Sequence, residues 1–259
     1  MRSPVLFVSH GSPMLALEPE HAWARALRAC GDSHGAKAIL VVSAHWWTPD
    51  LRITTSEQPV TIHDFSGFPE ALSRIAYPAP GSPALAARAM ELVRASGIPI
   101  TADPSRGLDH GAWSVLRHAH PEAELPVVQL SLPRWEPAAL VKLGQALAPL
   151  REEGVLLVAS GGLIHNLRAV DWDAPDDVVR PWAGEAEAWF ARHLDAGDTA
   201  ALLDHRARWA GSAQAAPTTD HLDPVFVALG AADGDPHRTV YEGFQLGTLS
   251  LRTWSWEAP

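Results

Sequence analysis

The sequence predicts an α/β fold, a single layered domain in which a central, mostly parallel sheet is flanked by helices. The main observation is that short apolar runs, typical of buried strands, alternate with longer segments of helical periodicity. The chain has 259 residues, enough for one domain with a sizeable core over residues 1–259. Its 47% hydrophobic and 19% charged residues are typical of a globular protein rather than a disordered one.

The predicted strands are short, mostly apolar segments. They span residues 4–9, 38–43, 51–55, 98–101, 126–132 and 155–160. Near the C-terminus, residues 246–256 alternate well enough to form an edge or closing strand. Because helical segments separate several of these strands, parallel connections are favoured.

The clearest predicted helix spans residues 82–96. Ser82 can cap its N-terminus, apolar residues repeat on one face, and Gly97 follows as a stop. Further helices are predicted over 20–29, 137–153, 183–195 and 219–230.

Charge and composition exclude several classes of protein. The net charge is −10 and basic residues do not cluster, so neither nucleic acid nor an anionic membrane is expected as a partner. The single cysteine, Cys30, rules out an internal disulfide framework and fits a reducing compartment. No apolar run is long enough for a membrane span or a signal peptide. These features predict a cytoplasmic protein, and they leave its oligomeric state undefined.

Three predicted strands each lead directly to a histidine. His10 follows the first strand, His45 follows the second, and His165 follows the strand at 155–160 across a small glycine turn. In open parallel sheets, ligands bind at the carboxyl edge of the strands. The shared setting therefore predicts a metal or substrate site at this edge.

Other candidate histidines lie in loops or near helix starts. His110 is in a glycine-flanked loop that enters a helix, and His221 lies near another helix start. His63 is in a polar loop, where it either lines the pocket or fixes the loop. Asp109 and Asp220 directly precede two of these histidines and are candidates to orient their imidazoles.

No compact zinc motif is present, so a metal site must be assembled from distant segments. The remaining histidines lie in helical or loop patterns and are expected to be structural: His21, His34, His118, His120, His193, His205 and His237. The sequence lacks a dinucleotide-binding glycine pattern, a Walker lysine and a hydrolase Gly-x-Ser-x-Gly turn.

The segments around the candidate histidines form an ordered set that runs from residue 9 to about residue 230. They are Ser9-His10-Gly11-Ser12-Pro13, Ser43-Ala44-His45-Trp46, His63-Asp64-Phe65 with Gly67-Phe68-Pro69, Tyr77-Pro78-Ala79-Pro80-Gly81, Leu108-Asp109-His110-Gly111-Ala112-Trp113, Pro126-Val127-Val128-Gln129-Leu130-Ser131, Ser160-Gly161 with His165-Asn166-Leu167, and Asp220-His221 with Pro224 and Ala228-Leu229-Gly230. In this set the chain resembles the class III extradiol ring-cleaving dioxygenases, specifically the 4,5-DOPA dioxygenase subgroup.

The resemblance implies a metal held by His10, His45 and His221. It also implies that His165 and His110 act as catalytic acid and base, in an order left open, with His165 a possible further ligand. Fe(II) is the metal expected for activity, and Zn(II) is possible as the bound metal, since neutral imidazoles suit both.

The implied reaction is cleavage of a catechol such as L-DOPA by O₂, at the 4,5 position, to a muconic semialdehyde. Trp46 and His63 are candidate substrate-binding residues, Trp46 as a wall for the flat ring or as a core residue. One departure is that Ala216 precedes Pro217, where the family pattern often has a histidine. The alternative is a zinc-binding hydrolase, or a non-catalytic protein that binds a metal or small molecule, on the same scaffold.

Overall fold

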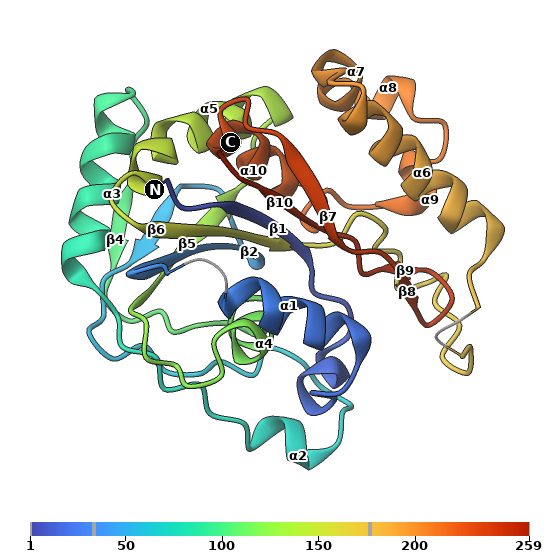
Figure 1. Cartoon of the computed structure of the whole chain (residues 1–259), viewed down its shortest axis with the longest axis horizontal. Helices are drawn as coiled ribbons and strands as arrows, with labels where there is room; N and C mark the ends of the chain where they lie inside the picture. Colours follow the sequence, from blue (N-terminus) through green and yellow to red (C-terminus); the bar gives the residue numbers. More distant parts are fainter. Residues whose placement is uncertain (1, 33–34, 176–177, 259) are drawn as a thin grey trace.

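A twisted sheet of mixed direction forms the centre of the molecule (Figure 1). In the part of the chain that the computed structural model describes, residues 2–32, 35–175 and 178–258, its eight strands lie in the order β4-β3-β5-β2-β6-β1-β10-β7. The neighbours β5, β2, β6 and β1 are parallel. On one side β10 pairs antiparallel with both β1 and β7, and on the other side β3 pairs antiparallel with β5. A second, small sheet pairs β8 with β9.

The strands are β1 (Val5–Ser9), β2 (Ala38–Thr48), β3 (Arg52–Thr54), β4 (Thr101–Asp103), β5 (Val127–Pro133), β6 (Val155–Gly161), β7 (His237–Tyr241), β8 (Phe244–Gln245), β9 (Leu249–Ser250) and β10 (Thr253–Trp256). The helices are α1 (Ala22–Asp32), α2 (Glu70–Ser73), α3 (Pro83–Ala95), α4 (His110–Ala119), α5 (Pro137–Leu147), α6 (Pro181–Asp195), α7 (Thr199–Leu203), α8 (His205–Arg208), α9 (Ser212–Ala215) and α10 (Pro224–Ala232), with 3₁₀ turns η1 (Pro13–Leu17) and η2 (Ala148–Arg151).

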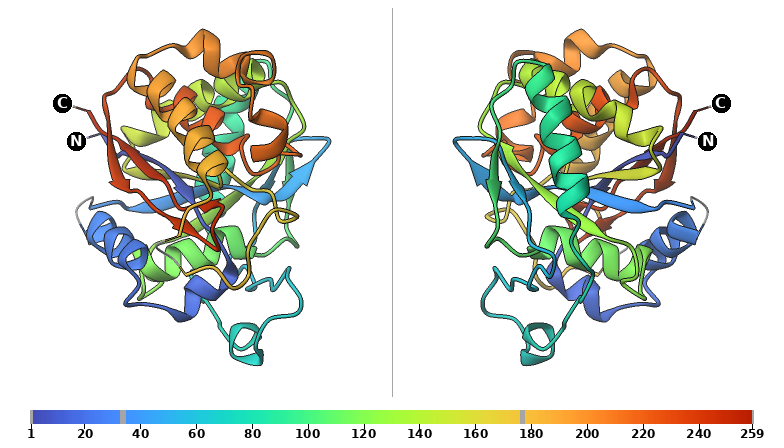
Figure 2. Two further views of the ribbon diagram at one scale, coloured as in Figure 1. Left: turned by 90° about the vertical axis from the view of Figure 1, so that its right-hand side faces the viewer. Right: turned by 90° about the vertical axis from the view of Figure 1, so that its left-hand side faces the viewer.

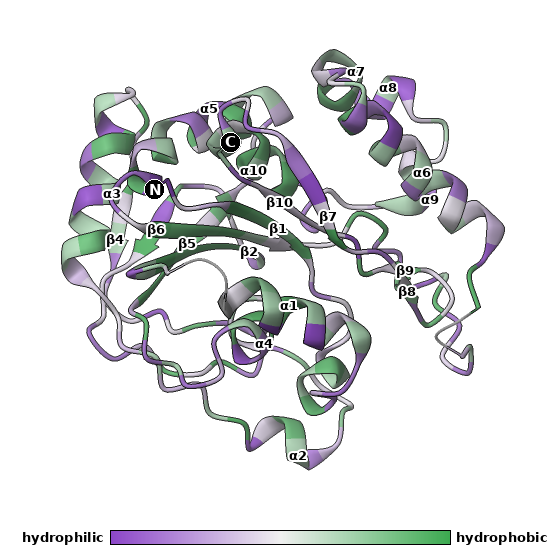
Figure 3. Ribbon diagram, viewed as in Figure 1, coloured by the Kyte–Doolittle hydropathy of each residue, from purple (hydrophilic) through white to green (hydrophobic). Residues whose placement is uncertain are grey.

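Helices cover both faces of the sheet. Figure 1 shows α3, α5 and α10 on one face and α1 with α4 on the other. Side chains of the inner strands alternate accordingly, with Val5 and Phe7 packing toward the first group and Leu6 and Val8 toward the second. Because both faces are buried, these strands are hydrophobic almost throughout (Figure 3). The predicted α/β layered architecture is confirmed.

The carboxyl ends of β1, β2 and β6 meet at one edge of the sheet, as the parallel pairing requires. The two chain ends lie near each other, beside the antiparallel pair β1 and β10 (Figure 2). The helix predicted over residues 82–96 forms as α3, and the Ser82 hydroxyl accepts a hydrogen bond from the amide of Leu85.

The predicted end of the second strand is wrong. It continues as β2 to Thr48, because pairing with β5 resumes after an irregularity between Val42 and Trp47. His45 therefore lies inside the irregular part of the strand rather than beyond its end.

Two predicted helices have different bounds because of proline. The segment predicted as 219–230 becomes helical only at Pro224, which occupies the first turn of α10, where its missing N–H costs nothing. His221 therefore lies in the turn before the helix. The segment 137–153 ends as an α-helix at Leu147 and continues as η2, in which Pro149 cannot donate the next helical hydrogen bond.

The outer strands also differ from the prediction. Residues 246–256 do not form one edge strand: Leu246 and Gly247 have positive φ in a turn, and β10 lies inside the sheet, between β1 and β7. The edge strand β7 was not predicted. The bounds of the strand expected over 98–101 are wrong: only Thr101 of that range belongs to β4, which runs from Thr101, paired with Arg52 of β3, to Asp103.

Candidate metal centre and pocket

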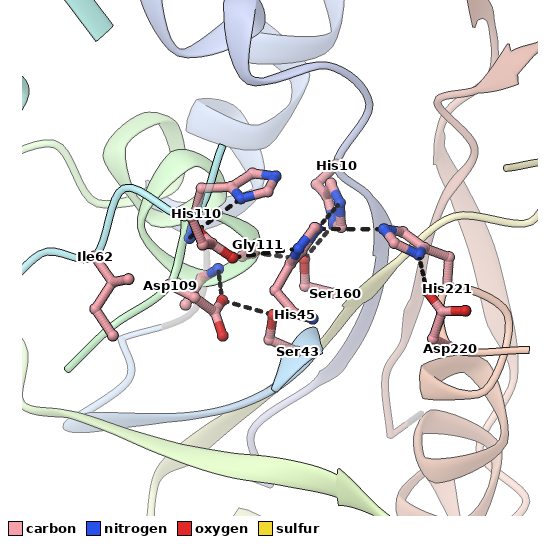
Figure 4. Close-up of polar contacts among 12 residues, drawn as sticks. His10, Ser43, His45, Ile62, Asp109, His110, Gly111, Ser160, Asp220 and His221 are labelled. Atoms are coloured by element: carbon pink, nitrogen blue, oxygen red, sulfur yellow. Dashed lines mark hydrogen bonds and ion pairs between the residues drawn. The ribbon is translucent and has the colours of Figure 1, made fainter. Parts of the chain in front are cut away.

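Three histidines from distant parts of the chain bring their Nε2 atoms together. His10 follows β1, His45 lies in β2 and His221 precedes α10 (Figure 4). The Nε2 atom of His45 is 3.1 Å from that of His10 and 3.2 Å from that of His221. Sequence positions 10, 45 and 221 thus meet at the sheet edge that the strand pattern indicated.

Hydrogen bonds at the opposite ring nitrogen fix the tautomer of His10. The Ser160 hydroxyl donates its proton to the carbonyl of Gly111 at 2.6 Å. It therefore accepts from Nδ1 of His10, which lies 3.0 Å away. With its proton on Nδ1, His10 presents a lone pair at Nε2.

Carboxylates fix the other two imidazoles in the same way. Nδ1 of His221 donates to Oδ2 of Asp220 at 2.6 Å, and Nδ1 of His45 faces Oδ2 of Asp64 at 3.3 Å. A carboxylate only accepts, so each imidazole carries its proton on Nδ1. The predicted orienting role of Asp220 has a direct contact in the structure, while Asp64 was not singled out in the sequence.

Three lone pairs that converge at this distance repel one another unless a cation lies between them. Bonds of about 2.0–2.1 Å to one metal, at angles between octahedral and tetrahedral, separate ligand nitrogens by about 2.8–3.4 Å. The spacings of 3.1 Å and 3.2 Å fall in that range. The donor set therefore fits a divalent metal that accepts imidazole ligands.

Burial favours the neutral form of two of these histidines, His10 and His221. Burial, followed by the charge of His45, lowers the pKa of His10 well below its ordinary value. Burial, followed by the charge of His165, lowers the pKa of His221 in the same direction. Neutral imidazoles are the form that a metal binds, so the site is ready for a metal near neutral pH.

Beside this centre, His110 begins α4 with its ring held from behind by Asp64. Oδ1 of Asp64 accepts from Nδ1 of His110 at 2.9 Å and from its backbone amide at 3.0 Å. The His110 and His45 ring centroids are 3.8 Å apart. Burial acts to raise the pKa of Asp64, but hydrogen bonds from His110 and His45 outweigh it and hold that pKa far below its ordinary value.

His165 lies on the other side of the centre. Its ring stacks on that of His221, with centroids 3.4 Å apart and planes 5° from parallel. Burial, followed by the charge of His45, lowers the pKa of His165 to about 4. Within the described residues, His165 is not part of a converging ligand group, which gives its possible role as a further ligand no support.

Asp109 does not orient His110, although it precedes it. The buried Asp109 carboxylate instead caps α4, accepts the Ser43 hydroxyl at 2.7 Å and accepts the amide of Gln129. Ser43 in turn accepts the backbone amide of His45 at 3.2 Å. Asp109 therefore fixes the backbone that carries His45.

Close backbone approach at this point requires glycine. A Cβ atom on Gly111 would lie 2.5 Å from the Ser43 hydroxyl oxygen and 3.0 Å from Cδ2 of His45. On Gly161, at the end of β6, it would lie 2.1 Å from the carbonyl oxygen of His221. These glycines let the chain segments that carry His45 and His221 approach their neighbours closely.

All five histidines line one cavity of about 630 Å³, a size typical of small-molecule sites. Its walls are mostly apolar and are formed by Phe65, Phe68, Leu167, Trp172, Leu246 and Leu249. The wall residue Trp172 is 62% exposed. The cavity therefore combines apolar walls with a group of histidine rings, a lining that suits an aromatic ring with polar substituents.

The two predicted substrate-binding residues lie elsewhere. Among the described residues, neither Trp46 nor His63 belongs to the cavity lining. Trp46 is buried beneath the guanidinium of Arg106, 5.3 Å from its ring centroid. His63 donates from Nε2 to the carbonyl of Ile75 at 2.9 Å and packs on Phe65, so it fixes the loop that carries this wall.

The histidines expected to be structural stay outside the cavity wherever they are described. His118 and His205, for example, hydrogen-bond to backbone carbonyls. His34 lies outside the described residues. No helix in the described ranges is long and apolar enough to span a membrane.

Comparison with known proteins assigns the fold and site to a class of enzyme. Residues 4–250 match the family described as the catalytic LigB subunit of aromatic ring-opening dioxygenase. The chain belongs to this family of extradiol ring-opening dioxygenases, which are metal-dependent enzymes. The family does not favour the alternative of a zinc hydrolase or a non-catalytic binding protein.

Particular relatives agree with this assignment. The chain is 43% identical to 4,5-DOPA dioxygenase extradiol of Escherichia coli K12, over 96% of this chain and 93% of that protein. It is 39% identical to the protein of the same name from Beta vulgaris, over 96% and 94%. The crystal structure of an uncharacterized protein from Escherichia coli K12 superposes with a TM-score of 0.80 at 34% identity, over 99% of this chain and 100% of that one.

Proposed function

We propose that the protein is an Fe(II)-dependent extradiol dioxygenase that cleaves L-DOPA or a closely related 4-substituted catechol at the 4,5 position. The observation that carries the proposal is the convergence of three Nε2 lone pairs in a cavity that two further histidines also line. The names of the similar bacterial and plant proteins support the substrate class.

In this proposal His10, His45 and His221 hold the iron. When bound, Fe(II) supplies the redox chemistry that lets O₂ react with the catechol, and both oxygen atoms enter the ring-opened muconic semialdehyde. An imidazole binds a metal in its uncharged form, so three histidine ligands leave the centre with the full charge of the cation. That charge favours binding of the catechol as an anion.

His110 is the proposed base. Because its Nδ1 proton is held by Asp64, its Nε2 atom is the ring nitrogen that can accept a proton from a catechol hydroxyl. The imidazolium that forms then lies 2.9 Å from the Asp64 carboxylate, which stabilises the added charge.

His165 is the proposed proton donor. It would protonate an oxygen atom that O₂ has delivered to the substrate, after His110 has accepted the catechol proton. Its low pKa keeps it neutral at neutral pH, and a neutral imidazole still has one N–H to donate. His165 and His110 both line the cavity, on separate elements, so accepting and donating a proton fall to different groups. Ring opening needs one group that accepts a proton and another that donates one, and these two histidines would supply both.

The apolar walls are proposed to hold the ring and its substituent. Phe65 and Phe68 come from the loop before α2, and Leu167 and Trp172 come from the connection between β6 and α6. These groups bury the hydrophobic faces of the catechol and keep water from the reacting edge.

The test is a measurement of O₂ uptake by metal-free protein reloaded with Fe(II) under anaerobic conditions. With L-DOPA, 4-methylcatechol and dopamine as substrates, we expect O₂ and catechol to disappear in equal amounts as a yellow product forms. The same protein loaded with Zn²⁺ binds catechol without consuming O₂, because zinc is redox-inert. Absence of O₂ uptake with every catechol and Fe(II) would refute the proposal.

A further inference from the structure

Asp64 contacts two histidines that the proposed function gives different tasks. It lies in the loop between β3 and α2, and its side chain is 22% exposed at the cavity wall. One oxygen, Oδ1, accepts from the amide and Nδ1 of His110 at 3.0 Å and 2.9 Å. The other oxygen, Oδ2, lies 3.3 Å from Nδ1 of His45.

This arrangement fixes where both imidazoles carry their proton. Each has its Nδ1 proton directed at the carboxylate, so each leaves Nε2 free. For His45, Nε2 is the atom that converges with His10 and His221. For His110, whose ring lines the cavity, Nε2 is the atom left for substrate.

We propose that Asp64 is a positioning residue that holds the metal ligand His45 and the base His110 in one tautomer through its two carboxylate oxygens. The assignment of His110 as base rests on the proposed function, whereas the effect of Asp64 on His45 concerns metal binding alone. Residues that orient metal ligands in this way commonly contribute about 10- to 100-fold to metal affinity or activity.

The requirement for a carboxylate follows from counting donors. Three N–H groups face Asp64, two from His110 and one from His45. Asparagine offers one accepting oxygen and one donating NH₂ group, so one imidazole must face another donor. The oxygen is best used on His110, where it satisfies two N–H groups. In D64N, His45 is therefore expected to move its proton to Nε2 or to rotate, and either change removes a ligand.

A competing interpretation is that Asp64 itself binds a second metal with His45 and His110, since their ligand atoms also lie within 4.8 Å of one another. Such a metal would have to replace the Nδ1 protons of both imidazoles. It would also compete with the backbone amide of His110 for Oδ1. The hydrogen-bond pattern thus favours protons over a metal at this position.

The experiment titrates metal-free protein with Zn²⁺ by calorimetry, using wild type, D64N, D64E and D50N. Asp50 is a matched control, an aspartate whose side chain is 70% exposed and pairs with Arg52 outside the cavity. We expect D64N to bind Zn²⁺ roughly 10- to 100-fold more weakly than wild type, D64E to recover part of the loss, and D50N to match wild type.

Two further readouts keep the test decisive. In zinc-loaded wild type, ¹⁵N NMR of the histidines is expected to show the protons of His45 and His110 on Nδ1; a proton on Nε2 of His110 overturns the proposal without any variant. In the iron enzyme, D64N is expected to lower kcat more than it raises KM for L-DOPA. The proposal is also overturned if D64N binds zinc as tightly as wild type does. It is overturned as well if wild type binds two zinc ions and D64N binds one.

These results separate the inference from the proposed function. If wild type consumes no O₂ with any catechol but D64N binds zinc weakly, the hold of Asp64 on His45 stands and the proposed function fails. If wild type turns over catechol and D64N keeps full zinc affinity and kcat, the proposed function stands and the inference fails.

Discussion

At the residue scale, the proposed metal ligands depend on hydrogen-bond partners at the Nδ1 atoms of their rings. Ser160 is fully buried and connects Nδ1 of His10 to the carbonyl of Gly111. The S160A variant leaves the His10 N–H without an acceptor, and a buried unpaired donor costs about 1–3 kcal/mol. We expect metal affinity to fall about 10-fold or more, as measured by zinc titration. S73A, which alters an exposed hydroxyl, is the control; equal affinity in S160A and wild type would contradict this role.

The backbone at Gly111 is packed too closely to accept a larger side chain. An added methyl group would lie 2.5 Å from the Ser43 hydroxyl oxygen and would press on His45. We expect G111A to lower both metal affinity and the free energy of unfolding, the latter by about 1–3 kcal/mol, as for other overpacked sites. In G184A, on α6, the nearest atom is 3.7 Å away, so stability should hold or rise. Denaturant unfolding of both variants makes the comparison, and equal stability would show that the site has room at position 111.

Of the three proposed ligands, His10 and His45 were predictable from the strand pattern, because parallel strands bring their carboxyl ends to one edge of a sheet. His221 follows no strand and was implied only by the resemblance to the dioxygenase family. Among their partners, Asp220 was predictable because it directly precedes His221, but Asp64 and Ser160 were not. Asp64 and Ser160 lie far along the chain from the imidazoles they orient, and only the folded sheet brings them together. Asp109 illustrates the converse, since it precedes His110 yet contacts Ser43 and Gln129 instead.

At the element scale, the connection between β6 and α6 forms one wall of the cavity. Trp172 on this connection is 62% exposed and lines the cavity, where its indole can contact a bound aromatic ring. We expect W172A to raise KM for L-DOPA by roughly 3- to 10-fold with little change in kcat, because the indole contributes equally to binding the substrate and the transition state. V60A, which truncates another exposed side chain outside the lining, is the control. A fall in kcat with unchanged KM would contradict the role.

Element boundaries were predictable where the sequence contains a local signal. Ser82 starts α3 by capping it, and Pro224 starts α10 later than apolar periodicity suggested. The extension of β2 through His45 has no such signal, because it depends on pairing with β5. The edge strand β7 is polar and half-exposed, so hydrophobic periodicity did not reveal it.

At the scale of the whole molecule, buried histidines outside the site make stability depend on pH. Burial lowers the pKa of both His118 and His205. The unfolded chain therefore binds more protons than the folded one as the pH falls below about 6.5, the ordinary pKa of histidine. The stability contributed by these neutral histidines is present above that pH and is lost toward the lower folded-state values.

We expect the free energy of unfolding of metal-free protein, measured in urea, to decrease between pH 7.5 and pH 5.5. In the double variant H118Q/H205Q, the slope should be smaller, because two of the groups that take up protons on unfolding are gone. The same slope in the double variant and in wild type would contradict this source of the pH dependence.

The central claim is that His10, His45 and His221 together hold the iron through their Nε2 atoms. The most direct test is a crystal structure of the Fe(II)-loaded protein with anomalous diffraction data collected on both sides of the iron edge. We expect one iron peak at about 2.0–2.2 Å from all three Nε2 atoms, with His110 and His165 outside bonding distance. A peak bound instead by Asp64 and His110, or no peak at the three histidines, would contradict it.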